Sequence, residues 1–459
     1  MGLLNKITQY KELKGGVKHC TFNPDGPGVV RIHLIPPKFK LLKNSSYIVI
    51  LNGYYLLPLG YSWAVMLSRF MAETNLFDGR EIGESDYKAI FDRTVKATRK
   101  VYPFISKEEI SDDLSLMLEV IFAVARGEAV DTVDIERMSI RSYADNMYAP
   151  HRMDLMISAM TDGEGRWKCN QKCLFCYAAG ESLSATKEMS TDDWKRAIDN
   201  LKKAGVPMLT FTGGEPTQRE DLCRLIEYSK WFVTRLNTNG TLLTEELCEE
   251  LCRASLDSLQ ITLYSHDESI HNSLVGAPCF DRTAQGIKNA VAAGLDVSIN
   301  TPLCRKNADY LETLRFISSL GVRFVTVSGL ICTGMAENRH GEYDLTADEL
   351  YNILKEAKAF CNENGLEIDF TSPGLVDEER LEALGMNTPM CGACLSNMAI
   401  APDGTVIPCQ SWLNSEGALG NILTDSFKDI WENDKCKRLR NMTDAEARCC
   451  PFRKGGHNG

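Results

Sequence analysis

The stretch from about residue 150 to about residue 340 alternates short apolar segments with longer amphipathic ones. The amphipathic segments include 191–205 and 280–294, each of which ends at a glycine. Strand–helix units repeated in this way predict a parallel sheet, here a partial (β/α)6 TIM-like barrel of α/β class. In such a barrel the active site lies at the carboxyl ends of the strands. The six strand candidates are DLMIS, MLTFT, VTRLNTN, LQITLY, VSINTPL and FVTVSGL.

The 459-residue length predicts two or three domains, which we place at residues 1–140, 141–345 and 346–459. The first contains strand candidates at 29–36, 47–51 and 54–59, then three amphipathic helices, which predicts a winged-helix-like module. Asn52-Gly53 predicts a type I′ hairpin turn. The third helix opens with Ser/Glu capping signals and is expected to end at Gly127.

Composition narrows the class of protein. The formal net charge of -11 argues against a protein that follows a nucleic-acid backbone, which needs a basic face. An uncharged run at 47–68 is long enough for a membrane span, but its turn residues favour a hairpin feeding a helix, so no membrane association is expected. The N-terminus lacks a signal-peptide pattern, and 17 cysteines then indicate a reducing compartment, so we expect a cytoplasmic protein.

Three cysteines follow the first predicted barrel strand: Cys169, Cys173 and Cys176, spaced C-x₃-C-x₂-C. A [4Fe–4S] cluster is normally held by four thiolates, so three would leave one iron open for a substrate or cofactor. The alternative is a structural zinc or redox cluster whose fourth ligand comes from elsewhere. The position of the loop, at the carboxyl end of a strand, favours a catalytic site.

A second motif, FTGGEPT at 211–217, directly follows the second predicted strand. Consecutive glycines at Gly213 and Gly214 let a ligand approach the backbone closely. Glu215 offers a carboxylate to an ammonium group. A Gly-Gly-Glu turn alone is a weak signal, but one strand after the cysteine loop it supports a cofactor site.

In this order, the two motifs resemble those of the radical S-adenosylmethionine (SAM) superfamily. The resemblance implies that Cys169, Cys173 and Cys176 hold a [4Fe–4S] cluster whose open iron is chelated by SAM. It also implies that reductive cleavage of SAM gives a 5′-deoxyadenosyl radical, which abstracts a substrate hydrogen. The resemblance further implies that three parts of the chain contact the cofactor: the aromatic residue after the cysteines, the Gly-Gly-Glu-Pro turn, and the polar ends of strands three and four. The residues are Tyr177, Gly213, Gly214, Glu215, Pro216, Asn239, Tyr264 and Ser265.

One position departs from that family's pattern. Relatives often have an arginine before the glycine of the following helix, where this chain has Val275 before Gly276. We expect Arg305 or Lys306, after strand five, to replace the arginine's contact with the SAM carboxylate.

The C-terminal region holds a second set of cysteines around a turn signal at 402–404. It resembles the SPASM and twitch extensions of radical SAM enzymes, so we expect a C-terminal Fe–S SPASM/twitch-like domain. The resemblance implies one auxiliary [4Fe–4S] cluster, and a zinc ribbon is the alternative. Its expected ligands are Cys391, Cys394, Cys409 and one of Cys449 and Cys450, with Cys436 as a substitute.

The N-terminal module resembles the PqqD-like domains that recognise precursor peptides. An exposed strand edge could capture an extended peptide by adding it to the sheet, and the alternative is a structural cap on the barrel. Cys304 and Cys332 follow strands five and six, and either could donate a hydrogen atom to a substrate radical. Partly buried thiols without a function are the alternative for both.

These features predict a radical SAM enzyme that modifies a ribosomally made precursor peptide. The expected chemistry is hydrogen abstraction followed by thioether or carbon–carbon crosslinking, or by epimerisation. An external electron donor such as flavodoxin or ferredoxin is implied. The alternatives are a twitch-type dehydrogenase of a small molecule and a non-catalytic iron–sulfur or zinc protein.

Overall fold

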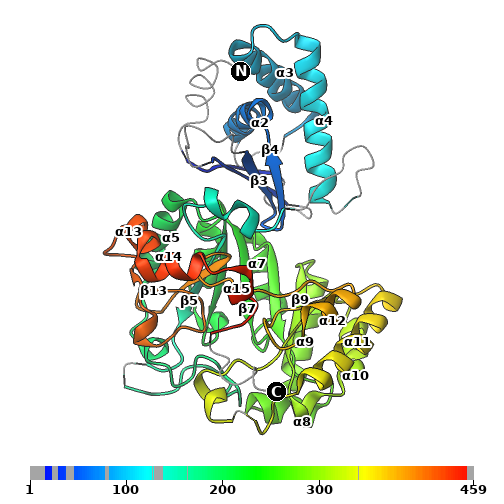
Figure 1. Ribbon diagram of the computed structural model, residues 1–459, viewed down its shortest axis with the longest axis vertical. Helices are drawn as coiled ribbons and strands as arrows, with labels where there is room; N and C mark the ends of the chain where they lie inside the picture. Colours follow the sequence, from blue (N-terminus) through cyan, green and yellow to red (C-terminus); the bar gives the residue numbers. More distant parts are fainter. Residues whose placement is uncertain are drawn as a thin grey trace. The chain divides into compact units, whose positions relative to one another are not determined.

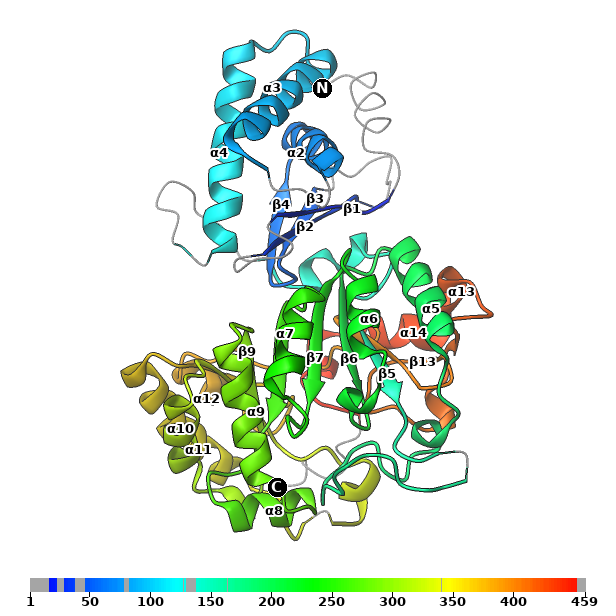
Figure 2. The same ribbon diagram turned by 180° about the vertical axis from the view of Figure 1, so that it is seen from behind.

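The structure is a computed structural model that describes residues 16–22, 29–37, 46–77, 82–126, 128, 138–162, 164–339 and 341–451. The chain forms two compact units (Figures 1 and 2). One unit comprises Met1–His151 with the short segments Leu201–Met208 and Trp231–Val233, and the other comprises the rest of the chain.

The N-terminal unit is built on an antiparallel sheet in the order β1-β2-β3-β4. Its strands are β1 (Lys18–Phe22), β2 (Val30–Ile35), β3 (Tyr47–Leu51) and β4 (Tyr55–Leu59). The last three were predicted, whereas β1 was missed. Asn52 and Gly53 have φ of 50° and 70°, so both residues of the predicted hairpin turn are left-handed.

Three helices follow this sheet: α2 (Tyr61–Thr74), α3 (Glu84–Val101) and α4 (Lys107–Ala125). Ser106 and Glu109 form a reciprocal capping box at the start of α4, as their spacing predicted. The predicted end of this helix at Gly127 lies outside the described residues. Apolar side chains from the sheet and all three helices form one core, which includes Ile32, Val49, Phe70, Ile90 and Leu114.

The second unit contains a ten-stranded sheet in the order β11-β10-β9-β8-β7-β6-β5-β12-β13-β14. All six predicted barrel strands are present, and the partial-barrel fold is confirmed. They are β5 (Arg152–Ser158), β6 (Met208–Gly213), β7 (Val233–Thr238), β8 (Ser258–Thr262), β9 (Val297–Pro302) and β10 (Phe324–Ser328).

The region after residue 346 contributes strands to both sides of this sheet. β11 (Glu367–Phe370) pairs in parallel with β10, and β12 (Asn397–Ile400) pairs in parallel with β5. The antiparallel strands β13 (Thr405–Ile407) and β14 (Gly420–Asn421) complete the sheet. The C-terminal region is therefore continuous with the barrel sheet.

Helices cover one face of the barrel sheet, as Figure 2 shows for α7 and α9. The predicted helix ends are confirmed, because α5 stops before Gly205 and α9 stops before Gly294, both left-handed. Within the described residues, no helix is long and apolar enough to cross a membrane. The helices are α5 (Thr191–Ala204), α6 (Leu222–Tyr228), α7 (Glu245–Arg253), α8 (Glu268–Val275), α9 (Phe280–Ala292), α10 (Tyr310–Ser319), α11 (Ala347–Asn364), α12 (Glu378–Ala383), α13 (Phe427–Glu432), α14 (Asp434–Arg440) and α15 (Asp444–Ala447).

The two faces of the barrel strands differ in polarity. Leu236, Leu259, Ile299 and Val327 are fully buried and point towards the helices. Because side chains alternate along a strand, their neighbours point to the inner face. Those neighbours are polar and half-buried: Arg235, Asn237, Gln260, Ser298, Asn300 and Thr326.

Candidate functional site

The three-cysteine loop follows β5 and rests on the end of α8. The backbone N–H groups of Lys172 and Leu174 donate to the carbonyl oxygens of Val275 and Leu274 at 2.9 and 2.8 Å. Gly276 is left-handed, with φ of 65°, and a Cβ there would lie 2.4 Å from the Lys172 carbonyl oxygen. The Val275-Gly276 pair therefore supports the loop, and only glycine fits at its second position.

A second segment, directly after Cys332, holds the other end of the loop. The Met335 N–H donates to the Cys176 carbonyl at 3.0 Å, and the Thr333 hydroxyl donates to the Tyr177 carbonyl at 3.3 Å. Gly334 sits so close that a Cβ would be 2.5 Å from the Cys176 carbonyl oxygen. Cys332 is thereby held beside the cysteine loop.

The three thiols are close enough to influence one another electrostatically. Burial, with smaller contributions from Glu215 and Cys176, raises the pKa of Cys169 to about 12. Burial, and then Cys176 and Cys169, raises the pKa of Cys173 well above its ordinary value. Metal binding requires thiolates, so a metal must displace protons from these thiols when it binds.

The Gly-Gly-Glu turn at the end of β6 packs directly against the end of β5. Gly213 has φ of 143°, and a Cβ there would lie 2.4 Å from the Ser158 carbonyl oxygen. A Cβ on Gly214 would lie 2.8 Å from the Ala159 carbonyl oxygen. The Ser158 hydroxyl beside this turn is buried and has no hydrogen-bond partner among the described residues. The turn therefore needs both glycines and leaves a polar group available to a ligand.

Glu215 is 2% exposed, and its carboxylate serves the protein itself. It accepts hydrogen bonds from the Thr217 N–H at 3.0 Å, the Thr238 hydroxyl at 2.6 Å and the Asn239 N–H at 2.9 Å, and also from the Thr217 hydroxyl. Burial raises its pKa. These bonds tie the turn to the end of β7, and the predicted contact with an ammonium group stays a prediction. Pro216, also predicted, is buried at the start of the following turn.

Asn239 connects the end of β7 to the cysteine loop. Its side-chain amide donates to Asn170 at 2.7 Å, and Asn170 in turn donates to the Thr241 hydroxyl at 2.7 Å. Asn170 was not predicted, although it lies inside the cysteine motif. Thr238 was also missed as a partner of Glu215, because contacts between strand ends are not visible in a linear sequence.

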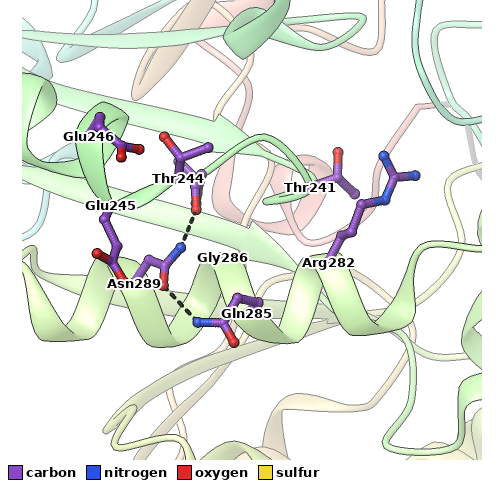
Figure 3. A pocket seen from close by; sticks show the side chains of 9 residues that line it. Thr241, Thr244, Glu245, Glu246, Arg282, Gln285, Gly286 and Asn289 are labelled. Carbon is purple, nitrogen blue, oxygen red and sulfur yellow. Dashed lines mark hydrogen bonds between the residues drawn. The ribbon is translucent and has the colours of Figure 1, made fainter.

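Thr241 also borders a surface pocket of about 240 Å³ between the start of α7 and α9 (Figure 3). There Asn289 donates to the Leu243 carbonyl and accepts from Gln285, both at 2.8 Å. None of the predicted site residues lines this pocket, whose walls are Thr241, Leu243, Thr244, Glu245, Glu246, Arg282, Gln285, Gly286 and Asn289.

Tyr264 and Cys304 are buried beside the cysteine loop. They share an apolar cluster with Phe175, and Cys173 packs against that cluster. Burial, followed by Cys173, Cys176 and Cys304, raises the pKa of Tyr264. Ser265, also predicted, uses its hydroxyl to accept from the Asp267 N–H at 3.1 Å. The structure therefore brings Tyr264 and Cys304 to the predicted site.

Arg305 lies apart from this group. Its guanidinium is exposed and donates to Glu349 of α11 at 2.7 Å. Lys306 stacks over the ring of Tyr343, with its nitrogen 5.6 Å from the ring centroid. The hydrogen bond of Arg305 and the ring contact of Lys306 both lie outside the cysteine loop, so the predicted contact to the SAM carboxylate gains no support from the geometry.

Tyr177 links the cysteine loop to the C-terminal region. Its hydroxyl donates to the Gln410 side-chain oxygen at 3.1 Å, and Gln410 directly follows Cys409. Backbone bonds from Leu183 to Leu413 and from Met189 to Pro402 add to this contact. Apolar side chains from both regions share one core, which includes Met156, Ala178, Ala179, Ala399, Ile407 and Leu413.

The C-terminal cysteines form two neighbouring groups. Burial, and then Cys391 and Cys450, raises the pKa of Cys409, which places these three thiols near one another. Cys394 hydrogen-bonds to Cys436, which raises the pKa of Cys394, and Cys409 adds to that effect. The bond to Cys394 lowers the pKa of Cys436, helped by Arg440, which donates to its sulfur at 3.5 Å.

Cys449 points elsewhere: its thiol donates to the Cys450 carbonyl at 3.6 Å. The geometry therefore favours Cys450 over Cys449 as the companion of Cys391, Cys394 and Cys409.

Single metal ions and iron–sulfur clusters need different arrangements of their ligands. Across the described ranges, no three His, Cys, Asp or Glu side chains converge as a mononuclear metal requires. Each cysteine of a [4Fe–4S] cluster binds a different iron, so its ligands surround a volume and do not meet at a point. Three grouped thiols at a strand end, beside a glycine turn with an unsatisfied hydroxyl, fit the predicted iron–sulfur site with an open ligand position.

Comparison with known proteins agrees with that class. The Radical SAM superfamily pattern matches residues 168–317, and an iron–sulfur cluster-binding domain called SPASM matches residues 391–451. The chain is 32% identical over 287 residues to an Fe-coproporphyrin III synthase of Methanosarcina barkeri, covering 58% of this chain and 71% of that protein. The chain belongs to the radical SAM superfamily, whose members bind SAM and a [4Fe–4S] cluster.

Other relatives differ in their reactions. An AdoMet-dependent heme synthase of M. barkeri is 28% identical, covering 62% of this chain and 86% of that protein. The mycofactocin maturase MftC of Mycolicibacterium smegmatis is 24% identical, covering 59% and 69%. Streptococcus suis SuiB, bound to its precursor peptide SuiA, has a similar fold, with a TM-score of 0.60 at 15% identity, covering 92% of this chain and 91% of SuiB.

Proposed function

We propose that this enzyme modifies a ribosomally made precursor peptide. A [4Fe–4S] cluster held by Cys169, Cys173 and Cys176 would, together with SAM, supply the 5′-deoxyadenosyl radical that abstracts a hydrogen atom from the peptide, which would lead to a crosslink or an epimerised residue. An external donor such as flavodoxin or ferredoxin supplies the electron. Cys304 and Cys332, both held beside the cysteine loop, are the hydrogen donors proposed for epimerisation.

The observation that carries this proposal is the presence of the N-terminal unit. Met1–His151 makes up about a third of the chain, so the 92% match to SuiB includes most of it. The match to the heme synthase covers 62% of the chain. SuiB was solved with a precursor peptide bound, and a precursor peptide is therefore the partner proposed for this chain.

The sheet of the N-terminal unit offers a site for such a peptide at its β4 edge. Among the described strands, β4 pairs with β3 alone. At the opposite edge, Asn75 donates to the His19 carbonyl of β1 at 2.8 Å, so part of that edge is engaged. An extended leader peptide would add to β4 through main-chain hydrogen bonds.

The test uses the full-length, anaerobically reconstituted enzyme with SAM, a reductant and the peptide encoded beside its gene. We expect a mass change in the peptide together with 5′-deoxyadenosine. Leu56→Pro in β4 should weaken leader binding, because the Leu56 N–H points away from β3 and proline removes that donor and distorts the edge. Thr21→Pro in β1 is the matched control at the other edge. Equal losses in both variants, or no change in peptide mass with the wild-type chain, would contradict the proposal.

A second candidate is a reaction on a tetrapyrrole. It is favoured by the identities of 28% and 32% to the M. barkeri heme synthase and Fe-coproporphyrin III synthase. The two candidates separate when the same reconstituted enzyme is given Fe-coproporphyrin III in place of the peptide. A new tetrapyrrole product with an unmodified peptide would favour this second function.

A further inference from the structure

The inner face of the barrel sheet carries an arginine without an anionic partner. Arg235 lies on β7 between Thr234 and Leu236, which are both fully buried on the helix-covered face. Arg235 therefore points to the inner face, where it donates to the Ser298 hydroxyl on β9 at 3.2 Å. In the described part of the chain, it forms no ion pair.

Arg152 on β5 provides a comparison within the same sheet. Its guanidinium donates to the Asp154 carboxylate at 2.8 Å, so this carboxylate is already paired with a cation. Asp154 is 1% exposed, so the pair involves a buried carboxylate. Burial, followed by Arg152, lowers the pKa of Arg235 to about 10, and Asp154 and Asp296 offset only part of that shift. At neutral pH Arg235 is a charged group with one neutral hydrogen-bond acceptor.

Unsatisfied polar atoms accompany this arginine. Arg235 Nε, Asn237 Oδ1 and the Thr210 hydroxyl are buried, and none has a hydrogen-bond partner among the described residues. Thr210 lies on β6 between Leu209 and Phe211, both fully buried against the helices, so it shares the inner face. Native proteins rarely leave buried polar atoms unpaired, so a group of them on two adjacent strands points to a missing ligand.

The neighbouring inner-face side chains satisfy one another. Gln260 donates to the Thr326 hydroxyl at 3.0 Å, and Thr326 donates to Asn300 at 3.0 Å. Apart from the Ser158 hydroxyl beside the Gly-Gly-Glu turn, the unsatisfied groups are therefore local to β6 and β7. They combine a cation, an acceptor and a hydroxyl.

We propose that Arg235 binds a carboxylate of the substrate, with Thr210 and Asn237 contacting polar groups next to it. A guanidinium is suited to this because it presents its donors in a planar fork that matches a carboxylate. Arg235 precedes the end of β7 at Thr238 by three residues, or about 10 Å of strand. The carboxylate is thus held deeper in the barrel than the Gly-Gly-Glu turn, and the carbon that reacts lies between them.

This inference rests on the proposed function and names the substrate's chemistry: an acidic side chain or terminal carboxylate of the peptide. The same chemistry could come from a tetrapyrrole carboxylate, so the test has an arm for each source.

The first measurement needs no substrate and compares two arginines on one face. Arg235→Met and Arg152→Met are unfolded with urea in the full-length, reconstituted enzyme. Removing Arg152 leaves the buried Asp154 unpaired, so the urea midpoint of Arg152→Met should be lower than that of the wild type. Removing Arg235 takes away an unpaired cation, so the urea midpoint of Arg235→Met should equal or exceed that of the wild type. If the urea midpoint of Arg235→Met is lowered as much as that of Arg152→Met, then Arg235 is structural and the proposal is overturned.

The second measurement pairs Arg235→Gln with the peptide encoded beside the gene, in which each Asp or Glu is changed in turn to Asn or Gln. For one acidic position we expect KM to rise about tenfold or more in the wild type. Arg235→Gln should show that rise with the unchanged peptide and little further rise with the substituted one. Arg235→Lys should recover part of the loss, because it restores the charge without the fork.

The other arm measures binding of Fe-coproporphyrin III to the wild type and to Arg235→Gln. If the peptide is not modified but Fe-coproporphyrin III binding weakens about tenfold in the variant, the proposed function fails and the carboxylate site stands. If neither probe depends on Arg235, the carboxylate site itself is overturned.

Discussion

The two cysteine regions of this enzyme are built in different ways. Cys169, Cys173 and Cys176 lie in one short loop, which is held by backbone contacts to the end of α8 and to residues 333–335. The C-terminal cysteines span 391 to 450 and come together through tertiary contacts, such as the 2.6 Å bond from the Cys391 N–H to the Ala447 carbonyl. A contiguous loop can keep its ligands grouped locally, whereas a dispersed set depends on the fold around it.

The two regions also differ in what surrounds their thiols. The loop cysteines adjoin Glu215 and Tyr264, which lie at strand ends of the barrel. The C-terminal thiols adjoin each other and Arg440. The first set supplies three thiols, one fewer than a complete ligand set, as a catalytic cluster needs, and the second supplies enough thiols for a complete set.

The largest effect is expected from removing either set of cysteines. The reconstituted wild type should hold about eight irons, and the Cys169/Cys173/Cys176→Ala variant should hold about four and form no 5′-deoxyadenosine. The Cys391/Cys394/Cys409→Ala variant should lose the other four. Iron and sulfide analysis, with product analysis by chromatography, measures both.

The fold around the first set should survive without its cluster, because backbone bonds hold that loop. Circular dichroism of both triple variants provides the control. If the wild type holds about four irons and the Cys169/Cys173/Cys176→Ala variant holds none, the C-terminal cysteines bind no cluster. That result would contradict the interpretation of the two cysteine regions as two cluster sites.

The same difference explains what could be predicted from sequence. The loop cysteines and the Gly-Gly-Glu turn are contiguous motifs, so their residues were identified before the fold was known. The six barrel strands were equally clear, because their buried residues alternate or run continuously between helical segments. β1 and β11 were missed because KHCTF and EIDF are short and carry little apolar pattern.

Contacts between residues far apart in the sequence could not be predicted from the sequence. Arg305 was predicted to face the cofactor because it follows strand five, but the partner that engages it, Glu349, lies on a later helix. Arg235 drew no attention, since one arginine in a strand pattern does not reveal whether a carboxylate lies opposite. Only the assembled sheet shows that Arg235 forms no ion pair with a carboxylate among the described residues.

The next effect concerns the fourth ligand of the C-terminal set. Cys450→Ser should lower the iron content from about eight to about four, because Cys450 lies near Cys409 and Cys391. Cys436→Ser should keep its iron, since Cys436 is engaged with Cys394 and Arg440. Cys449→Ser is the adjacent control. If Cys436→Ser loses the iron and Cys450→Ser keeps it, the grouping of these thiols is wrong.

Acid should affect the barrel loop before the C-terminal set. His271 on α8 is fully buried, its Nε2 has no partner in the described chain, and burial lowers its pKa to about 4. The unfolded chain takes up a proton near pH 6.5, so the stability from neutral His271 is complete above that pH and is lost towards pH 4. Between pH 7 and pH 5 the loss should be about 2 kcal/mol.

Hydrogen–deuterium exchange at pH 7 and pH 5, corrected for intrinsic rates, measures this loss locally. Peptides covering 169–176 should lose protection, because α8 supports that loop, while peptides covering 391–409 should change less. His271→Phe should remove the pH dependence, and His266→Phe should retain it. Equal loss of protection in both regions at pH 5 would show that His271 does not act locally.

The smallest effect probes the contact that joins the two regions. Tyr177→Phe keeps the ring in the shared core but removes the hydroxyl that donates to Gln410. One hydrogen bond of this kind contributes about 0.5–1.5 kcal/mol, and the hydroxyl also bonds to Thr212, so the free energy of unfolding should fall by at least that amount. A cycle with Gln410→Leu isolates the pair, because the double variant should cost less than the two single variants together. If the costs add, the hydroxyl and Gln410 are not coupled. The apolar core would then be what holds the C-terminal hairpin against the cysteine loop.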